Sequence, residues 1–401
     1  MKRLIISIFL IFSLFLTGCN VANTKSKSIA KNSQIKKIDA VKNKINTMSL
    51  DDKIGQLVIV GLDGFTITNN INNLIKNHKV GGIILFKTNV DNSKQLVNLT
   101  NSLKTSDFQN KTPLFISVDE EGGRVSRMPN EINNFPTNKS IGKSNNSNLS
   151  YNIGKTIAEE LNDFGFNMNF APVLDINSNV NNPVIGDRSL GSNPGIVSKL
   201  GIRTMNGMRD NNIIPVIKHF PGHGDTSVDS HIGLPIVSKD LTTLNNFELI
   251  PFKEAIKNNA DAIMVSHILL NKIDANNPAS MSKTVITSIL RKSLKFTGVV
   301  ITDDMTMGAI IKYNDIGKAA VKSFNAGSDI ILVCHGYSNE IKVINSLKQA
   351  VKDKTISESR LNESVYRILK LKEKYNINNK NISSSIDINT INDKIETTLR
   401  N

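Results

Sequence analysis

The stretch "GVVITDD" (298–304) is a short run of β-branched residues that begins at a glycine and ends in two carboxylates. Such a run is typical of a strand in a parallel sheet that is covered on both faces. Adjacent residues of a strand point to opposite faces, so we expect Asp303 and Asp304 to have different roles. One should enter a site as a nucleophile or an electrostatic stabiliser, and the other should cap the following helix.

Seven further runs of this kind recur along the chain, with helix-length spacers between them. They are "IGQLVIVG" (54–61), "VGGIILF" (80–86), "PLFISVD" (113–119), "MNFAPVLD" (168–175), "IIPVIKHF" (213–220), "DAIMVSH" (261–267) and "DIILVCH" (329–335). Helical patterns occupy 152–165, 196–211 and 317–327, and another at 359–375 follows the last strand. We therefore predict an α/β fold, a (β/α)₈ TIM-type barrel that forms a single domain over residues 47–376.

Nearly every predicted strand ends in a polar or ionisable residue. These residues are Asp119, Asp175, Lys218, His219, His267, Asp303, Asp304 and His335. In a barrel, the carboxyl ends of all eight strands converge on one mouth, whereas an open sheet gathers only those near its switch point. The pattern therefore favours a barrel over a doubly wound sheet or a two-domain solute-binding lipoprotein.

The first residues have the features of an export signal. Lys2 and Arg3 precede an apolar run over 4–16, which is too short to span a bilayer and is typical of a secretory signal. The small residues of "LTGC" (16–19) resemble a bacterial lipobox. We therefore expect a signal peptide over 1–18, lipidation of Cys19, and an exported lipoprotein anchored to the cell membrane.

The net charge of +14 owes much to the lysines of residues 19–46, whose Lys-, Asn- and Ser-rich composition predicts a disordered basic tether. Nucleic-acid binding is not expected, because the chain has no Trp, few Tyr and no interleaving of aromatic and basic residues. The second cysteine, Cys334, sits in an apolar run and is expected to be a buried small hydrophobe. Residues 377–401 are expected to form a C-terminal tail.

The stretch "KHFPGHGDTSVDSHIGLP" (218–235) concentrates histidines and aspartates in a segment that no regular helix could hold. One interpretation is a zinc site formed from a loop by His219, His223, Asp229 and His231. The other is acid/base chemistry by Asp229 and His231, whose side chains project to the same side of an extended loop. A carboxylate beside an imidazole fixes its tautomer and suits a group that donates and then accepts a proton. A turn cap and a packed histidine are the structural alternative.

Two arginine-bearing motifs complete the set of candidate functional residues. "VDEEGGRVSR" (118–127) sends out Arg124 and Arg127 after a glycine turn, and "GDRSLG" (186–191) presents Arg188 between glycines. These guanidinium groups are candidates for binding a sugar or an anion, with surface ion pairs as the alternative.

Together, these four motifs resemble glycoside hydrolase family 3, in its β-N-acetylglucosaminidase branch, over a region from "SLDDKIGQL" (49–57) to the last predicted helix. The resemblance implies a catalytic barrel and retaining hydrolysis of terminal β-linked N-acetylglucosamine, with no metal and no cofactor. It implies Asp303 as the nucleophile and His231, paired with Asp229, as the general acid/base. It further implies sugar binding by Asp119, Arg127, Arg188, Lys218 and His219.

Glu120 stands where this family often has glutamine, and we expect little effect because it lies on the face opposite Asp119. Gly222 and Gly224 are expected to let the loop that carries His231 swing. The expected partners are N-acetylglucosamine-containing glycans or muropeptides and, through the lipid anchor, the membrane; the expected state is a monomer. The alternatives are a β-N-acetylglucosaminide phosphorylase and a non-catalytic sugar-binding lipoprotein.

Overall fold

The structure is a computed structural model that describes residues 39–400. The predicted signal peptide, Cys19 and most of the predicted tether lie outside the described residues. Within them, the strands are β1 (Val58–Val60), β2 (Gly82–Leu85), β3 (Phe115–Val118), β4 (Met168–Asn169), β5 (Ile214–Phe220), β6 (Ile236–Val237), β7 (Ala262–Val265), β8 (Leu269–Leu270), β9 (Val299–Thr302) and β10 (Ile331–Val333).

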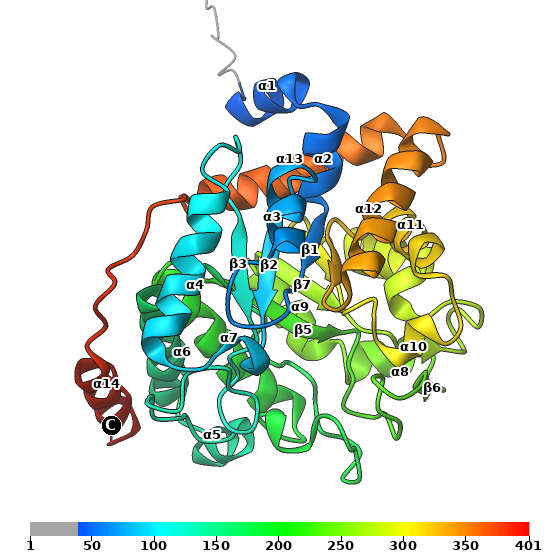
Figure 1. Ribbon diagram of the computed structural model, residues 1–401. Helices are drawn as coiled ribbons and strands as arrows, with labels where there is room; N and C mark the ends of the chain where they lie inside the picture. Colours follow the sequence, from blue (N-terminus) through cyan, green and yellow to red (C-terminus); the bar gives the residue numbers. More distant parts are fainter. Residues whose placement is uncertain (1–38, 401) are drawn as a thin grey trace, which may run out of the picture. The chain divides into compact units, whose positions relative to one another are not determined.

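Helices precede the first strand and alternate with most of the others (Figure 1). They are α1 (Ala40–Thr47), α2 (Leu50–Gln56), α3 (Asn69–Lys76), α4 (Ser93–Ser106), α5 (Asn138–Ser144), α6 (Ser147–Asp163), α7 (Pro194–Asp210), α8 (Leu241–Asn246), α9 (Ile250–Lys257), α10 (Gly308–Ile311), α11 (Ile316–Ala326), α12 (Tyr337–Lys352), α13 (Glu358–Lys374) and α14 (Ile388–Arg400). Short 3₁₀ turns occur at η1 (Lys87–Asn89), η2 (Gly186–Arg188) and η3 (Ala279–Met281), and η4 (Thr284–Ser293) is π-helical.

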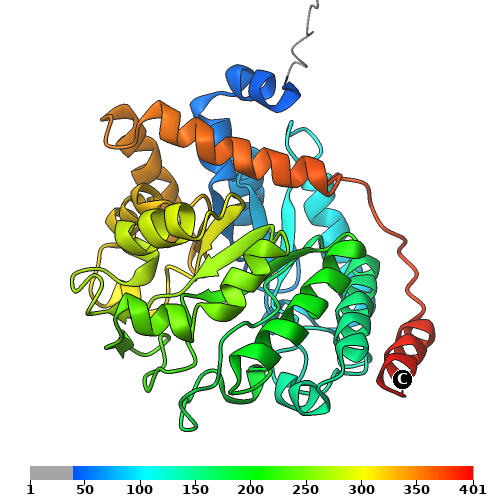
Figure 2. The same ribbon diagram turned by 180° about the vertical axis from the view of Figure 1, so that it is seen from behind.

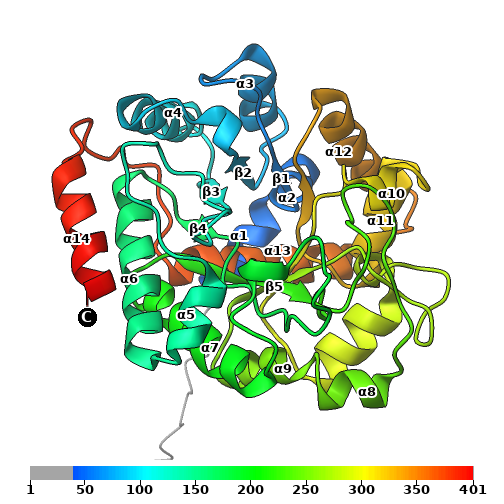
Figure 3. The ribbon, with the colours of Figure 1, turned by 90° about the horizontal axis from the view of Figure 1, so that it is seen from below.

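The predicted (β/α)₈ barrel is confirmed. Eight parallel strands pair in the order β10-β1-β2-β3-β4-β5-β7-β9, and a bridge between Ile301 and Ile330 joins β9 to β10. Figure 3 looks onto the ring of strands, with the helices arranged around it. Each predicted apolar run contains one of these eight strands, as expected for strands that are buried on both faces.

All eight barrel strands are shorter than their apolar runs, and β1 and β4 keep the smallest share of them. Residues 54–56 belong to α2, whose start is fixed by a capping box in which Ser49 and Asp52 bond to each other's backbone N–H groups. Strand β4 keeps only two residues of the run 168–175, because Pro172 has no N–H to donate to a neighbouring strand. Strands β6 and β8 form a small separate sheet that the sequence did not predict.

Helix α13, which matches the pattern at 359–375, lies across the amino-terminal end of the barrel beside α1 (Figure 2). Lys372 sends its ammonium group into that end, where it donates to Gly81 O and Gln56 Oε1, both at 2.8 Å, and to Pro113 O at 2.6 Å. Among residues 39–400, no helix is both long and apolar enough to cross a membrane.

Both ends of the described region form helices that pack against the rest of the domain. Residues 40–46, expected to belong to the tether, form most of α1, because Val41 and Ile45 find apolar cover one turn apart. The expected C-terminal tail contains α14, which packs against α6 through the buried residues Ile391 and Ile395. These helices extend the packed region beyond the predicted bounds of 47–376.

Candidate active site

A cavity of about 560 Å³ opens at the carboxyl ends of the barrel strands. Every catalytic and substrate-binding residue predicted from the sequence lines it. They are Asp119, Arg127, Arg188, Lys218, His219, Asp229, His231 and Asp303. The convergence expected for strand ends in a barrel is therefore observed.

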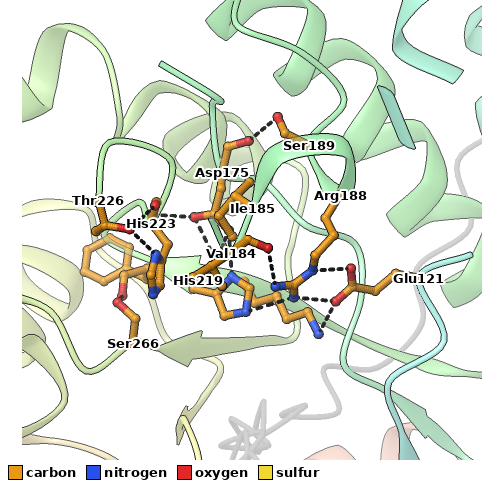
Figure 4. A network of polar contacts seen from close by, with 12 residues as sticks. Glu121, Asp175, Val184, Ile185, Arg188, Ser189, His219, His223, Thr226 and Ser266 are labelled. Atoms are coloured by element: carbon orange, nitrogen blue, oxygen red, sulfur yellow. Dashed lines mark hydrogen bonds and ion pairs between the residues drawn. The ribbon is translucent and has the colours of Figure 1, made fainter. Parts of the chain in front are cut away.

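Glu121 is the centre of a buried ion network on one wall of the cavity (Figure 4). Its carboxylate receives two bonds from Arg188, at 2.9 Å from Nε and 2.7 Å from Nη2, and lies 2.7 Å from the Lys218 ammonium. Lys218 also pairs with Asp119. Burial would raise the pKa of Glu121, but the charges of Arg188 and Lys218 outweigh it and hold that pKa well below its usual range. Glu121 is therefore ionised and fixes both cations.

Asp175, at the end of the fourth predicted strand, positions His219 from behind (Figure 4). Its Oδ2 lies 2.6 Å from His219 Nδ1, and its Oδ1 accepts from His223 N at 2.6 Å. Asp175 is fully buried, and although burial opposes ionisation, the neighbouring His219 lowers its pKa. With Nδ1 engaged, His219 presents Nε2, which is 3.5 Å from Arg188 Nη2. We call Asp119, Glu121, Asp175, Arg188, Lys218 and His219 the Glu121 network.

His223 belongs to the support of the site. Both ring nitrogens have protein partners, with Thr226 Oγ 2.8 Å from Nδ1 and Ser230 Oγ 3.2 Å from Nε2. Burial lowers the pKa of His223 to about 4, so its ring is neutral. Within residues 39–400, no three His, Cys, Asp or Glu side chains are grouped as metal ligands, so the zinc interpretation of this stretch finds no site there.

Asp303 and Asp304 diverge, as the alternation of side chains predicted. Asp303 faces the cavity; burial opposes its ionisation, but nearby His267 and His219 lower its pKa, so it is a carboxylate. Asp304 Oδ1 accepts from Thr306 N and Cys334 N, both at 2.9 Å. Asp304 therefore caps the turn that precedes α10. The N-cap residue of α10 itself is Met307, three residues later.

His267 supports the backbone at the end of β9, where Asp303 and Asp304 follow the strand. Its Nε2 is 2.9 Å from the carbonyl of Asp304, and its Nδ1 is 2.7 Å from Ser280 Oγ. Burial lowers the pKa of His267, although the neighbouring Asp303 opposes that shift. The two hydrogen bonds of its ring hold the backbone that carries both aspartates.

Asp229 and His231 lie in the 225–233 loop on another side of the cavity, and their predicted contact is confirmed. His231 Nδ1 is 2.8 Å from Asp229 Oδ1, which also accepts from His231 N at 2.9 Å. Burial opposes the ionisation of Asp229, but its bonds to His231 prevail and lower its pKa. The His231 side chain is 68% exposed, so Nε2 is available to a ligand.

The base of this loop is closely packed, and the expectation that Gly222 and Gly224 let the loop swing stays a prediction. A Cβ on Gly224 would lie 1.7 Å from Ile176 O, so glycine is needed there for close packing. Asn182 Nδ2 donates to His223 O at 2.9 Å, and Asn179 Nδ2 donates to Thr226 O at 3.1 Å. These contacts hold the backbone from His223 to Thr226.

The two arginines of the 118–127 motif have different surroundings. Arg124 pairs with Asp187 at 2.8 Å and donates to the carbonyl of Val184 at 2.6 Å, so it joins two loops. Among the described residues, none accepts a hydrogen bond from the buried Nε of Arg127. Arg127 is thus the arginine of this motif that is available to a ligand.

Glu120 points away from the cavity, as expected. It is buried, and its Oε2 accepts from Arg127 N at 2.7 Å. Burial raises the pKa of Glu120 to about 7. The pKa of nearby Glu160 is also raised, by burial and by Glu120.

Glu121, Asp175 and His267 belong to the candidate site, and the sequence analysis gave them no role. Glu121 could have been found, because it lies two residues beyond Asp119 and shares its face. Asp175 and His267 were noted as strand ends, but their partners come from other strands and have no signal in sequence spacing.

The glycosyl hydrolase family 3 N-terminal domain matches residues 49–371 of this chain. The chain belongs to glycosyl hydrolase family 3. Beta-hexosaminidase A of Pseudoalteromonas piscicida is 38% identical over 333 residues, which are 77% of this chain and 56% of that protein. A beta-hexosaminidase of Nitrosomonas eutropha is 31% identical over 325 residues, 79% of this chain and 92% of that protein.

A solved structure of similar fold is a glycoside hydrolase family 3 beta-N-acetylglucosaminidase from Paenibacillus. It superposes on this family 3 chain with a TM-score of 0.84 and 37% identity, over 88% of this chain and 68% of that one. The expected family and the expected enzyme class, a glycosidase, are therefore confirmed.

Proposed function

We propose that this family 3 protein is a retaining exo-hydrolase that releases terminal, non-reducing β-linked N-acetylglucosamine. The observation that carries the proposal is a single cavity that holds a carboxylate, Asp303, and an imidazole–carboxylate pair, His231 with Asp229. The printed names of the relatives, beta-hexosaminidases and a beta-N-acetylglucosaminidase, support this substrate class.

In the first step, the Asp303 carboxylate attacks the anomeric carbon and forms a glycosyl ester. The leaving oxygen takes a proton from Nε2 of protonated His231, so the bond to the aglycone breaks without a free alkoxide. The Nδ1–H of His231 remains bonded to Asp229, which stabilises the imidazolium form before transfer.

In the second step, neutral His231 acts as a base through the same nitrogen. With Nδ1–H held by Asp229, Nε2 is the acceptor and takes a proton from water as that water attacks the anomeric carbon. Two displacements at one carbon retain the β configuration, and Asp303 is released as a carboxylate.

The Glu121 network supplies fixed donors for the sugar. The cations of Lys218 and Arg188 are already neutralised by carboxylates, so they offer N–H donors to hydroxyl groups without attracting a charged ligand. Burial fixes these side chains before a substrate arrives, which favours a single orientation of the ring.

The test is hydrolysis of aryl β-N-acetylglucosaminide by the purified chain, with the anomer of the released sugar followed by NMR. Release of the β anomer first is expected, and initial release of the α anomer would exclude retention. A parallel reaction in phosphate tests the alternative of a phosphorylase, because that enzyme would yield sugar 1-phosphate. Sugar binding without turnover would indicate the non-catalytic lipoprotein.

We further propose that the protein acts as an exported, lipid-anchored monomer on N-acetylglucosamine-containing glycans such as muropeptides. Lys2, Arg3 and the apolar run before Cys19 support export and lipidation. A Cys19→Ser variant should move from the membrane fraction to the soluble fraction of the producing cell. Retention of this variant in the membrane fraction would contradict lipid anchoring at Cys19. The molar mass from light scattering tests whether the protein is a monomer.

A further inference from the structure

The tip of the 225–233 loop rests on α10 through three hydrogen bonds. Gly308 N donates to His231 O at 3.2 Å, and Ala309 N donates to Ser230 O at 3.0 Å. Lys312 Nζ donates to Ile232 O at 2.6 Å. These bonds hold the backbone on both sides of His231, whereas its ring remains exposed.

Gly308 allows this contact because it has no side chain. A Cβ at this position would lie 2.5 Å from His231 O and 3.0 Å from Ile232 O. Both are backbone atoms of the loop, so the loop would have to move to make room. The φ angle of Gly308 is not in the left-handed range, so alanine would fit the backbone of α10 itself.

The same short segment is tied to the strand that carries Asp303. Asp304 accepts from Thr306 N and Cys334 N, and Met305 N donates to Leu332 O at 2.9 Å. The path from Asp303 to Gly308 is therefore fixed to β10 and has little freedom. A loop that rests on Gly308 is therefore aligned with Asp303, because only four residues of ordered backbone separate the two.

We propose that Gly308 is a positioning residue: it seats the loop on α10 and so places His231 opposite Asp303. Gly308 touches no reacting atom; it acts through the carbonyl of His231. The kinetic effect that we expect rests on the proposed function. The inference predicts that loosening this contact impairs proton transfer selectively and leaves attack by Asp303 largely intact.

The test is Gly308→Ala with two substrates that differ in their need for an acid. For N,N′-diacetylchitobiose, whose leaving group needs protonation, we expect kcat/KM to fall on the order of 10²-fold. For 2,4-dinitrophenyl β-N-acetylglucosaminide, whose leaving group needs none, we expect a fall of less than about 3-fold. Should Gly308→Ala fail to fold, Lys312→Met removes one of the three bonds without a clash and should shift the ratio of the two constants in the same direction.

Gly154→Ala is the matched control. Its Cβ would lie 2.2 Å from Thr204 O, a clash of similar severity between α6 and α7, away from the cavity. A purely structural effect would lower Tm in both variants and leave the ratio of the two kcat/KM values at its wild-type value. An unchanged ratio in Gly308→Ala, with an active wild type, overturns the inference.

A second measurement separates this inference from the proposed function. Because the chain has no tryptophan, Ile232→Trp places a single tryptophan at the loop tip, where Ile232 is 66% exposed. Adding Gly308→Ala should lower the anisotropy of this Trp, and adding Gly154→Ala should not. If the wild type hydrolyses neither substrate, the proposed function fails, and unchanged anisotropy then overturns the docking as well.

Discussion

The Glu121 network and the 225–233 loop face the same cavity and are built in opposite ways. In the network, Lys218 and Glu121 are 2% and 1% exposed, and each has more than one ionic or hydrogen-bonded partner. In the loop, His231 is 68% exposed, and one carboxylate and three bonds to α10 set its place. The groups that we propose bind the sugar are held by several buried partners, and His231, which we propose transfers the proton, is held by fewer contacts on an exposed loop. In the proposed function, rigidity is concentrated where the sugar ring must be oriented.

The largest effect on activity is expected at Asp303, which faces the same cavity as the Glu121 network and the loop. Asp303→Ala should lower kcat/KM by about 10⁴-fold or more for every substrate, since the proposed attacking carboxylate is lost. Azide should restore turnover of an activated aryl glycoside and give the α-glycosyl azide, the product of a single displacement. Full activity of Asp303→Ala in the aryl assay would show that Asp303 is not the nucleophile.

Removing the ring of His231 tests the loop alone. His231→Ala should slow an unactivated glycoside by about 10²- to 10⁴-fold, because the acid that protonates the leaving oxygen is lost. A dinitrophenyl glycoside should form the glycosyl ester at nearly the wild-type rate, as measured by the pre-steady-state burst. Equal slowing of both substrates would argue against the acid role.

Glu121→Gln tests the network. The change leaves two buried cations without their shared carboxylate, and we expect a loss of about 3 kcal/mol in the free energy of unfolding and a higher KM. Because the pKa of Glu121 is held below its usual range in the folded state, its stabilisation exists at neutral pH and is lost as the pH falls through acid values. Unfolding by urea at neutral and acid pH measures both effects. A variant as stable as the wild type at neutral pH would show that the network does not depend on this charge.

Glu120→Gln makes the same substitution one residue away and should have the opposite effect on stability at neutral pH and the smallest effect on activity. The pKa of Glu120 is raised by burial from 4.5 to about 7, so the wild type loses stability as the pH rises through this range. The glutamine variant cannot ionise; it should match the wild type near pH 4.5 and exceed it by about 3 kcal/mol at most above pH 7. Parallel urea titrations across this range decide the matter, and a constant difference would show that Glu120 does not titrate there.

The sequence was informative where chemistry follows a strand end. Asp303 and Asp304 diverge because side chains alternate, and Asp119 and Lys218 meet because parallel strands end at one mouth. Spacing could not supply Asp175 as the partner of His219, because 44 residues separate them. The contact between Gly308 and the carbonyl of His231 could not be predicted from the sequence either, since it depends on how closely two backbone segments approach.

Lys372 has a consequence for how the chain is completed during synthesis. The ammonium that joins Gly81, Pro113 and Gln56 at the amino-terminal end of the barrel comes from a helix that ends at Lys374. A ribosome makes these acceptors before their donor, which follows Gly81 by 291 residues. A nascent chain therefore cannot close that end until α13 has emerged, which keeps the partly made barrel open at one end.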